Sequence, residues 1–181
     1  MKRKVLEYER DTEGRVIVNM VVKDDSNFLS VFSENKTPVI SSEVADFIES
    51  CTNTLIPGEQ LTLRIHSDCI DDQEKEIYRA AIKEYYSEKN VANERERVRN
   101  NTLAVTLFTL GVIVLAIDMI LKNRTPVSIW AEVIDIVAWV LLWEAVDITI
   151  FRNHETRNKR KHYSANLNMK IEYVSLKENK A

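Results

Sequence analysis

Glycine, cysteine and proline are scarce in this chain of 181 residues, which contains three, two and three of them. Three glycines are too few for the usual glycine-rich phosphate loop. The two cysteines, Cys51 and Cys69, are too few for a disulfide framework, and with no second pair of ligands they form no metal motif. We therefore expect no metal and no cofactor, and two buried, reduced thiols.

Groupings typical of catalysis are scarce as well. The tetrapeptide His66–Cys69 (HSDC) is the only suggestive one, but neighbours in sequence do not make a catalytic triad, because its geometry comes from the fold. The simpler interpretation is that Asp68 or Asp71 caps the helix that follows. We therefore expect that the chain is not an enzyme.

Two long apolar runs are present, at Thr102–Leu121 and Ser128–Phe151. Each is close to the ~20 residues that a helix needs to span the ~30 Å hydrocarbon core of a bilayer. The N-terminal sequence MKRKVLEYERD lacks the apolar segment of a secretory signal, so we expect no signal peptide. The two runs predict a two-helix transmembrane hairpin and a two-pass membrane protein.

The second apolar run carries four carboxylates, which lipid tolerates poorly. At about 100° per residue, three of them share an arc of roughly 120° with two tryptophans, and Glu144 lies about 60° beyond it. Copies of this helix around an axis would form acidic rings that attract cations, and a lone hairpin cannot enclose such a path, so a pore requires a homo-oligomer. Placement of the outermost acids at the membrane surfaces, with packed tryptophans, is the alternative. The residues expected at a pore or gate are Asp118, Glu132, Asp135, Trp139, Trp143, Glu144 and Asp147.

Basic residues flank the two runs. Residues 152–181 contain eight Lys or Arg and three Asp or Glu, whereas residues 1–100 contain fifteen and twenty. The positive-inside rule then places both termini in the cytoplasm, and attraction to anionic lipid would account for the same charges. A further interpretation is a phosphate-binding surface for a nucleotide or single-stranded nucleic acid, with an aromatic ring stacked on a base. Its residues would be Arg95, Arg97, Arg99, Arg152, Arg157, Lys159, Arg160, Lys161 and Tyr163, or His162 for the stacking.

The remaining sequence predicts strands and helices from its periodicity and its turn residues. Nothing interrupts the long helix before the first apolar run, so it would couple the soluble part to the membrane mechanically. The expected elements are a hairpin of strands at Lys4–Glu9 and Arg15–Lys23, a helix that Ser42 caps and that ends near Thr52–Thr54, a strand at Leu61–Ile65 with Leu61, Leu63 and Ile65 inward, a long helix from Asp71 through Arg99, and a C-terminal strand within Leu167–Leu176.

These elements predict an α+β fold in three parts. Residues 1–100 would form a small cytosolic sheet-and-helix domain whose long helix leads to the membrane. Residues 101–151 would form the transmembrane hairpin, and residues 152–181 a basic juxtamembrane segment and a strand that returns to the sheet. We expect about four strands and two helices in a domain built from both ends of the chain.

Two stretches carry a resemblance to a known family, Ala131–Asp147 (AEVIDIVAWVLLWEAVD) and Thr62–Tyr78 (TLRIHSDCIDDQEKEIY). With the sheet-rich domain and the long helix entering a two-helix hairpin, the chain resembles the membrane effector of bacterial Hailong anti-phage defence systems and, more loosely, two-span effectors of other nucleotide-signalled defence systems. The resemblance implies a homo-oligomeric ion channel in the bacterial inner membrane that depolarises the host in abortive infection. It also implies a nucleotidyltransferase-like partner whose short single-stranded DNA product holds the channel shut.

Two functional hypotheses follow. The first is a ligand-gated, cation-preferring oligomeric channel that acts as a membrane-depolarising anti-phage effector under the control of a nucleotide or a single-stranded DNA oligomer. The second is a non-conducting membrane-anchored scaffold or sensor, whose intramembrane acids pair with a basic residue of a partner protein.

Overall fold

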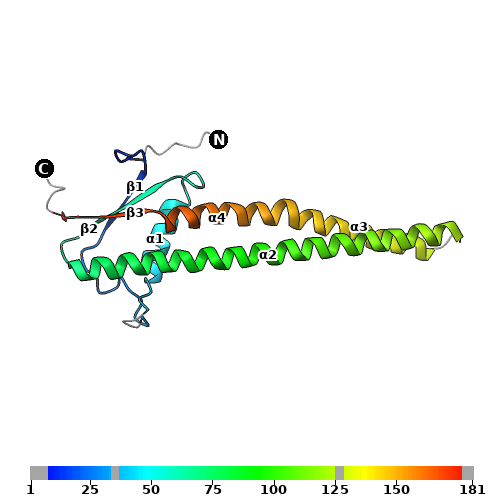
Figure 1. The fold of residues 1–181 in the computed structure, drawn as a ribbon, viewed down its shortest axis with the longest axis horizontal. Coiled ribbons are helices and arrows are strands. Elements are labelled where there is room, and N and C mark those ends of the chain that lie inside the picture. Colours follow the sequence, from blue (N-terminus) through cyan, green and yellow to red (C-terminus); the bar gives the residue numbers. More distant parts are fainter. Residues whose placement is uncertain (1–7, 34–36, 125–128, 177–181) are drawn as a thin grey trace. The chain divides into compact units, whose positions relative to one another are not determined.

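The computed structural model describes residues 8–33, 37–124 and 129–176. The chain forms two compact units, Met1–Val91 with Lys159–Ala181, and Ala92–Asn158. The first unit holds the sheet, and the described part of the second is helical, so the fold is α+β. In chain order the elements are β1 (Val16–Val21), α1 (Ser42–Thr52), β2 (Leu61–His66), α2 (Asp72–Arg124), α3 (Ile129–Asp147), a π-helix η1 (Ile148–Arg152), α4 (Asn153–Leu167) and β3 (Lys170–Val174) (Figure 1).

The sheet has three strands in the order β1-β2-β3, and both pairs are parallel. Parallel neighbours need a crossover connection. The segment containing α1 connects β1 to β2, and everything from α2 to α4 connects β2 to β3. The predicted return of a C-terminal strand to the sheet is confirmed, and the helical second unit is therefore an insertion in a crossover.

The predicted hairpin of strands differs from the structure. Its second run forms β1, but pairing with the preceding segment is reduced to one antiparallel bridge between Arg10 and Val16. Residues 4–7 of the first run lie outside the described residues. The described part of the chain thus holds three strands rather than four, and β1 lies at one edge of the sheet with β2 as its neighbour.

Two element boundaries also differ from the prediction. The Ser41 hydroxyl, not that of Ser42, accepts the capping hydrogen bond of α1, from Val44 N at 3.4 Å. The C-terminal strand lies within the predicted range, because β3 spans Lys170–Val174, but the basic segment before it is helical as far as Leu167. No proline or glycine interrupts residues 152–167, so the helix continues up to the start of that range.

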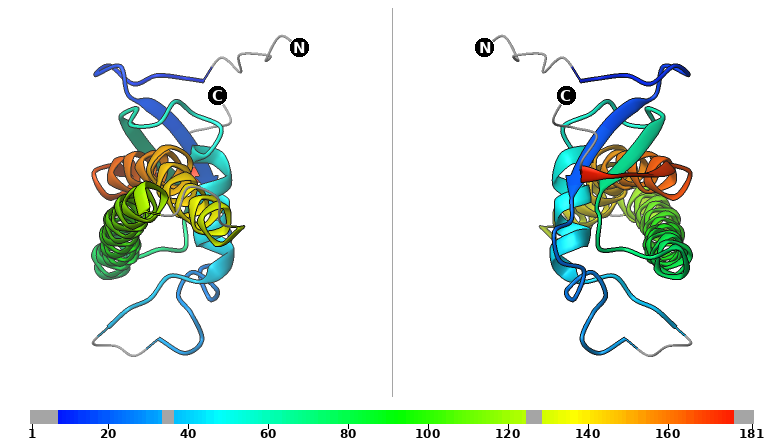
Figure 2. Two further views of the ribbon diagram at one scale, coloured as in Figure 1. Left: turned by 90° about the vertical axis from the view of Figure 1, so that its right-hand side faces the viewer. Right: turned by 90° about the vertical axis from the view of Figure 1, so that its left-hand side faces the viewer.

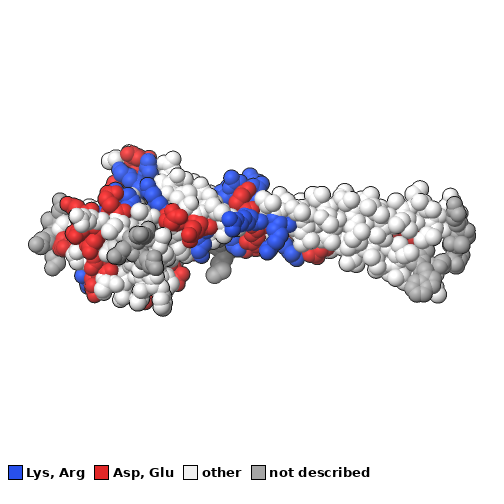
Figure 3. Space-filling model, turned by 60° about the horizontal axis from the view of Figure 1, so that its bottom comes forward, with Lys and Arg blue, Asp and Glu red and all other residues white. Residues whose placement is uncertain are grey.

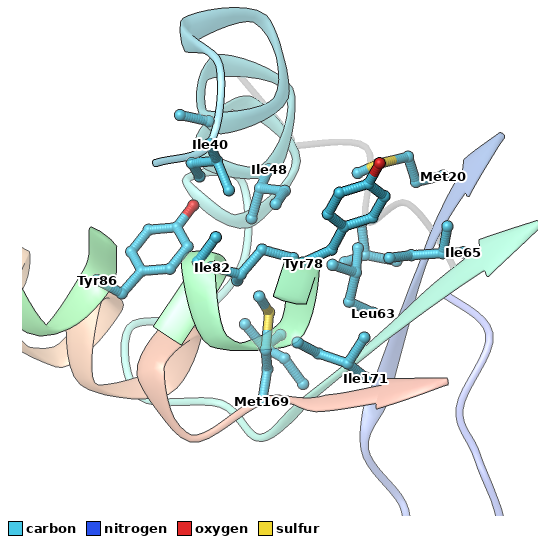
Figure 4. Packing of buried hydrophobic residues seen from close by; sticks show 14 of the residues in the cluster. Met20, Ile40, Ile48, Leu63, Ile65, Tyr78, Ile82, Tyr86, Met169 and Ile171 are labelled. Atoms are coloured by element: carbon cyan, nitrogen blue, oxygen red, sulfur yellow. The ribbon is translucent and has the colours of Figure 1, made fainter. Parts of the chain in front are cut away.

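The hydrophobic core lies between one face of the sheet and the helices α1 and α2 (Figure 4). Leu63 and Ile65 of β2 and Ile82 and Tyr86 of α2 are at most 1% exposed, and Leu61 is 3% exposed, which confirms the inward face predicted for β2. Burying one such aliphatic side chain contributes about 1.5–3 kcal/mol. Burial also raises the pKa of the Tyr86 hydroxyl.

The start of α2 is fixed by a reciprocal cap. Glu74 N donates to Asp71 Oδ1 at 2.7 Å, and Asp71 N donates to Glu74 Oε2 at 2.9 Å, which is the capping-box arrangement. Of the two residues proposed as the cap, Asp71 therefore caps α2. Asp68 instead accepts a hydrogen bond from Ser175 Oγ at 2.6 Å. Cys69 is exposed, so the expected burial of this thiol is wrong.

Candidate functional site

In the second unit, α3 and the part of α2 that precedes it in the chain form a helical hairpin. The two helices contact each other closely at small residues. A Cβ placed on Gly111 would lie 2.9 Å from Leu142 Cγ and 3.4 Å from the Ala138 carbonyl oxygen. Ala104 and Ala145 are also buried. Among the described residues, α2 is the one helix long and apolar enough to cross a membrane. The small residues therefore allow α2 and α3 to pack closely at this contact.

One charged cluster lies near the start of α3. Lys122 Nζ is 2.6 Å from Asp118 Oδ2 and 3.8 Å from Asp135 Oδ2, so one ammonium bridges carboxylates of two helices. The Asp118 side chain is only 5% exposed, and its Oδ1 is buried with no hydrogen-bond partner in the described structure. Sequence reasoning missed Lys122, although its i,i+4 spacing from Asp118 was the available signal.

A second charged cluster lies where α3 ends. Arg152 Nη2 is 3.0 Å from Glu144 Oε1, and Arg152 Nε is 3.8 Å from Asp147 Oδ2. Arg152 is the last residue of the π-helix η1. Single π-helical turns occur frequently at functional sites. The guanidinium, predicted for ligand binding, therefore neutralises two of the predicted pore carboxylates within the same chain.

The other predicted pore residues lie on exposed parts of α3. The tryptophans Trp139 and Trp143 are 62% and 74% exposed, and Glu132 in the first turn is exposed as well. The structure thus gathers Asp118 with Asp135, and leaves the two aromatic rings without cover from their own chain over most of their surface.

The predicted basic surface is divided between the two units. In the second unit, Arg95, Arg99 and Arg157 are exposed, and Arg97 lies 3.4 Å from Glu94. Figure 3 shows Lys and Arg side chains gathered together with Asp and Glu side chains, next to a mostly uncharged stretch of surface. Acidic side chains therefore lie among the basic side chains on this surface.

In the first unit, the predicted basic residues lie on α4. Lys159, Arg160 and Lys161 are exposed, whereas Tyr163 is half-buried and packs against the hydrophobic core. Burial lowers the pKa of the neighbouring His162. The cations are accessible to an anionic ligand, but a base could reach only the uncovered part of the Tyr163 ring.

Asparagine side chains form hydrogen bonds between α2 and α4, and sequence reasoning missed them. Asn93 Nδ2 donates to the Thr156 carbonyl oxygen at 3.0 Å, and Asn153 Nδ2 donates to Asn101 Oδ1 at 2.6 Å. Asn100 is also buried. Asparagine is a poor helix former, so its repetition in the middle of a helix is the sequence signal that could have revealed this contact.

The remaining suggestive grouping, at His66–Cys69, holds strand ends together. His66 Nε2 lies 3.0 Å from Asn19 Oδ1, which joins β2 to β1, and Asp68 joins the end of β2 to Ser175 after β3. In the described parts of the chain, no three His, Cys, Asp or Glu side chains are placed to hold a metal ion. Comparisons with protein-family models, with curated proteins and with solved structures find no match for this chain.

Proposed function

We propose that the chain is the subunit of an oligomeric ion channel in the cell membrane, gated by a nucleotide or a single-stranded DNA oligomer, whose opening depolarises the host cell during phage infection. The observation that carries the proposal is the surface of α3. In one copy, Asp135, Glu144 and Asp147 leave 39%, 45% and 37% of their side chains exposed, beside the exposed rings of Trp139 and Trp143.

Exposing these carboxylates to the hydrocarbon core of a membrane costs free energy. Insertion scales put a charged residue at the centre of a membrane helix at about 2.5–3.5 kcal/mol. The bridges from Lys122 and Arg152 reduce this cost but do not cover the carboxylates. Copies of the hairpin around an axis would give these acids a shared, hydrated interior, and acidic rings favour cations.

Gating requires a ligand that binds the shut and open states with different affinity. The exposed arginines and lysines of α2 and α4 are the groups suited to a phosphate backbone. Both helices continue without a break from one unit into the other, so they offer a route by which binding could act on the hairpin. Arg152 would take part directly, because a phosphate that draws it away leaves Glu144 and Asp147 unpaired.

The test is the membrane potential of bacterial cells that express the full chain, followed with a potential-sensitive dye. We expect depolarisation by the natural sequence and its loss or reduction in an Asp135→Asn, Glu144→Gln variant of equal abundance. The matched control is Glu76→Gln, Glu96→Gln, two acids of α2 outside the apolar run, which should depolarise like the natural chain. Equal depolarisation by all three proteins would show that Asp135 and Glu144 do not line the conduction path.

Ligand control is tested on the purified chain in liposomes. Ion flux that a short single-stranded DNA oligomer changes, in either direction, would support gating. Flux that is insensitive to DNA and to mononucleotides would contradict that part of the proposal while leaving the pore intact.

A second candidate function is a non-conducting membrane anchor. The observation that favours it is that Lys122 and Arg152 pair with three of the α3 acids within one chain. The hairpin could then sit in a membrane without a water-filled interior. A chain that is monomeric in detergent and carries no ion flux in liposomes would support the anchor over the channel.

A further inference from the structure

One turn of the first unit displays two large apolar side chains to solvent. Val31 is 87% exposed and Phe32 is 95% exposed. They lie in the turn Ser30–Ser33, closed by a hydrogen bond from Ser33 N to the Ser30 carbonyl oxygen at 2.9 Å. Figure 2 shows the loop that carries this turn projecting away from the strands and helices of its unit. We name residues Ser30–Ser33 the apolar knob.

The apolar knob is held in place by ordered contacts. Ser30 N donates to the Val39 carbonyl oxygen at 2.8 Å, and Val39 N donates to Ser33 Oγ at 2.9 Å. Its base is joined to the core, because Leu29 forms an antiparallel bridge with Ile40, which is 3% exposed. The structure therefore presents the Phe32 ring to solvent from a defined position.

The same unit carries an open groove that the apolar knob of its own chain does not fill. The groove holds about 250 Å³ and lies between the end of β1, the segment after it and the first turns of α1. Val21 and Phe47 in its wall are 56% and 40% exposed. Six of its ten lining residues are apolar, and the other four are polar or charged. The full lining is Met20, Val21, Val22, Lys23, Asp24, Asn27, Phe28, Glu43, Val44 and Phe47.

We propose that the Phe32 ring of one copy of this chain inserts into the Val21–Phe47 groove of a second copy. Each copy brings one knob and one groove, so a contact between identical chains uses both, and the groove has the volume and the apolar wall that one aromatic ring needs. An aromatic ring that fills a pocket of the partner is a common form of interface anchor.

The contact is too small to hold two copies together alone. A stable interface buries about 800 Å² per partner, and two side chains supply only part of that. The inference therefore rests on the proposed oligomer, in which association of the hairpins brings the soluble units together. The knob would then set how neighbouring units are arranged.

The experiment replaces Phe32 with the photo-crosslinking residue p-benzoylphenylalanine in the full chain, in membranes. Chains labelled with ¹⁴N and ¹⁵N are mixed before reconstitution, so that mass spectrometry separates crosslinks between copies from those within one copy. We expect mixed-isotope crosslinks from position 32 to the segments 20–28 and 43–47. The photo-residue placed at Ile56, which is apolar and 73% exposed in the same unit, is the control and should give no crosslink to these segments.

A second variant tests the groove. Phe47→Asp, at a partly exposed position, should reduce the crosslink from position 32 at least fivefold without changing the abundance of the chain. An oligomer whose position 32 reaches only lipid, another protein or its own chain would overturn the inference and leave the channel standing. Crosslinked copies without ion flux would support the inference and contradict the channel, and a monomeric chain would contradict both.

Discussion

Replacing Gly111 by alanine tests the closest contact of the hairpin. In a helix, alanine is favoured over glycine by about 1 kcal/mol. Against this gain, the new Cβ would lie 2.9 Å from both Cγ and Cδ2 of Leu142, and overpacking of this kind costs about 1–3 kcal/mol. Cγ is close to the backbone, and the Ala138 carbonyl oxygen lies only 3.4 Å away, so α3 itself must move. We expect the steric cost to exceed the gain, with a net loss of about 1 kcal/mol.

The assay is unfolding of the full chain in mild detergent by added dodecyl sulfate, followed by tryptophan fluorescence. All three tryptophans lie on α3, so the signal reports the environment of that helix. The control is Val112→Ala, at the neighbouring position, which is 46% exposed.

A double-mutant cycle makes the test specific to the steric contact. In a Leu142→Ala background the clash is removed, so Gly111→Ala should no longer destabilise the hairpin, and the coupling between the two substitutions should be about 1–2 kcal/mol. Stabilisation of about 1 kcal/mol by Gly111→Ala in both backgrounds would show that helix propensity alone decides, and would refute the close approach of α2 and α3.

Three further predictions concern the first unit. Leu63→Ala, at a site 1% exposed in the central strand, should lower the free energy of unfolding by about 2–5 kcal/mol in thermal or chemical denaturation, because it leaves a cavity; a loss under about 1 kcal/mol would contradict the close packing described. Asp71→Ala should cost about 0.5–2 kcal/mol in the same assay, because it removes the acceptor of the Glu74 N–H, whereas Asp71→Asn should retain most of the cap. Burial lowers the pKa of His162, so its contribution to stability is present above about pH 6.5, its ordinary pKa, and is lost as the pH falls below it, because the unfolded chain binds the proton more readily. His162→Gln should therefore flatten the fall in melting temperature between about pH 7.5 and 5.5, and an unchanged slope would assign that fall to other groups.

The helices were predictable because their signals are local. The capping residues and apolar spacing of 41–54 indicated α1 within about two residues of its observed ends, the usual uncertainty. The absence of a breaker after Asp72 indicated one helix that continues into the first apolar run. Alternation placed Leu61, Leu63 and Ile65 on one face of β2. Helix α4 was missed because the basic charges of 152–162 suggested a membrane flank and offered no apolar stripe.

The candidate site was only partly predictable. The acids of α3 are visible in the sequence because charge within an apolar run is unusual. Their partners are not, since the contacts of Lys122 with Asp135 and of Asn153 with Asn101 join different helices and depend on how those helices pack. The apolar knob and its groove likewise depend on a turn held against the core.

The sequence by itself determined the extents of α1 and α2, the two apolar runs, the inward face of β2 and the acidic character of α3, because each depends on residues within a few turns of one another. Only the tertiary structure decided that the sheet is parallel, that the hairpin is an insertion in the crossover from β2 to β3, and that Lys122 and Arg152 each bridge two carboxylates. Strand partners and ion pairs join residues far apart in the chain, and many pairings satisfy the same local pattern. The choice among them is made by the burial of one shared core.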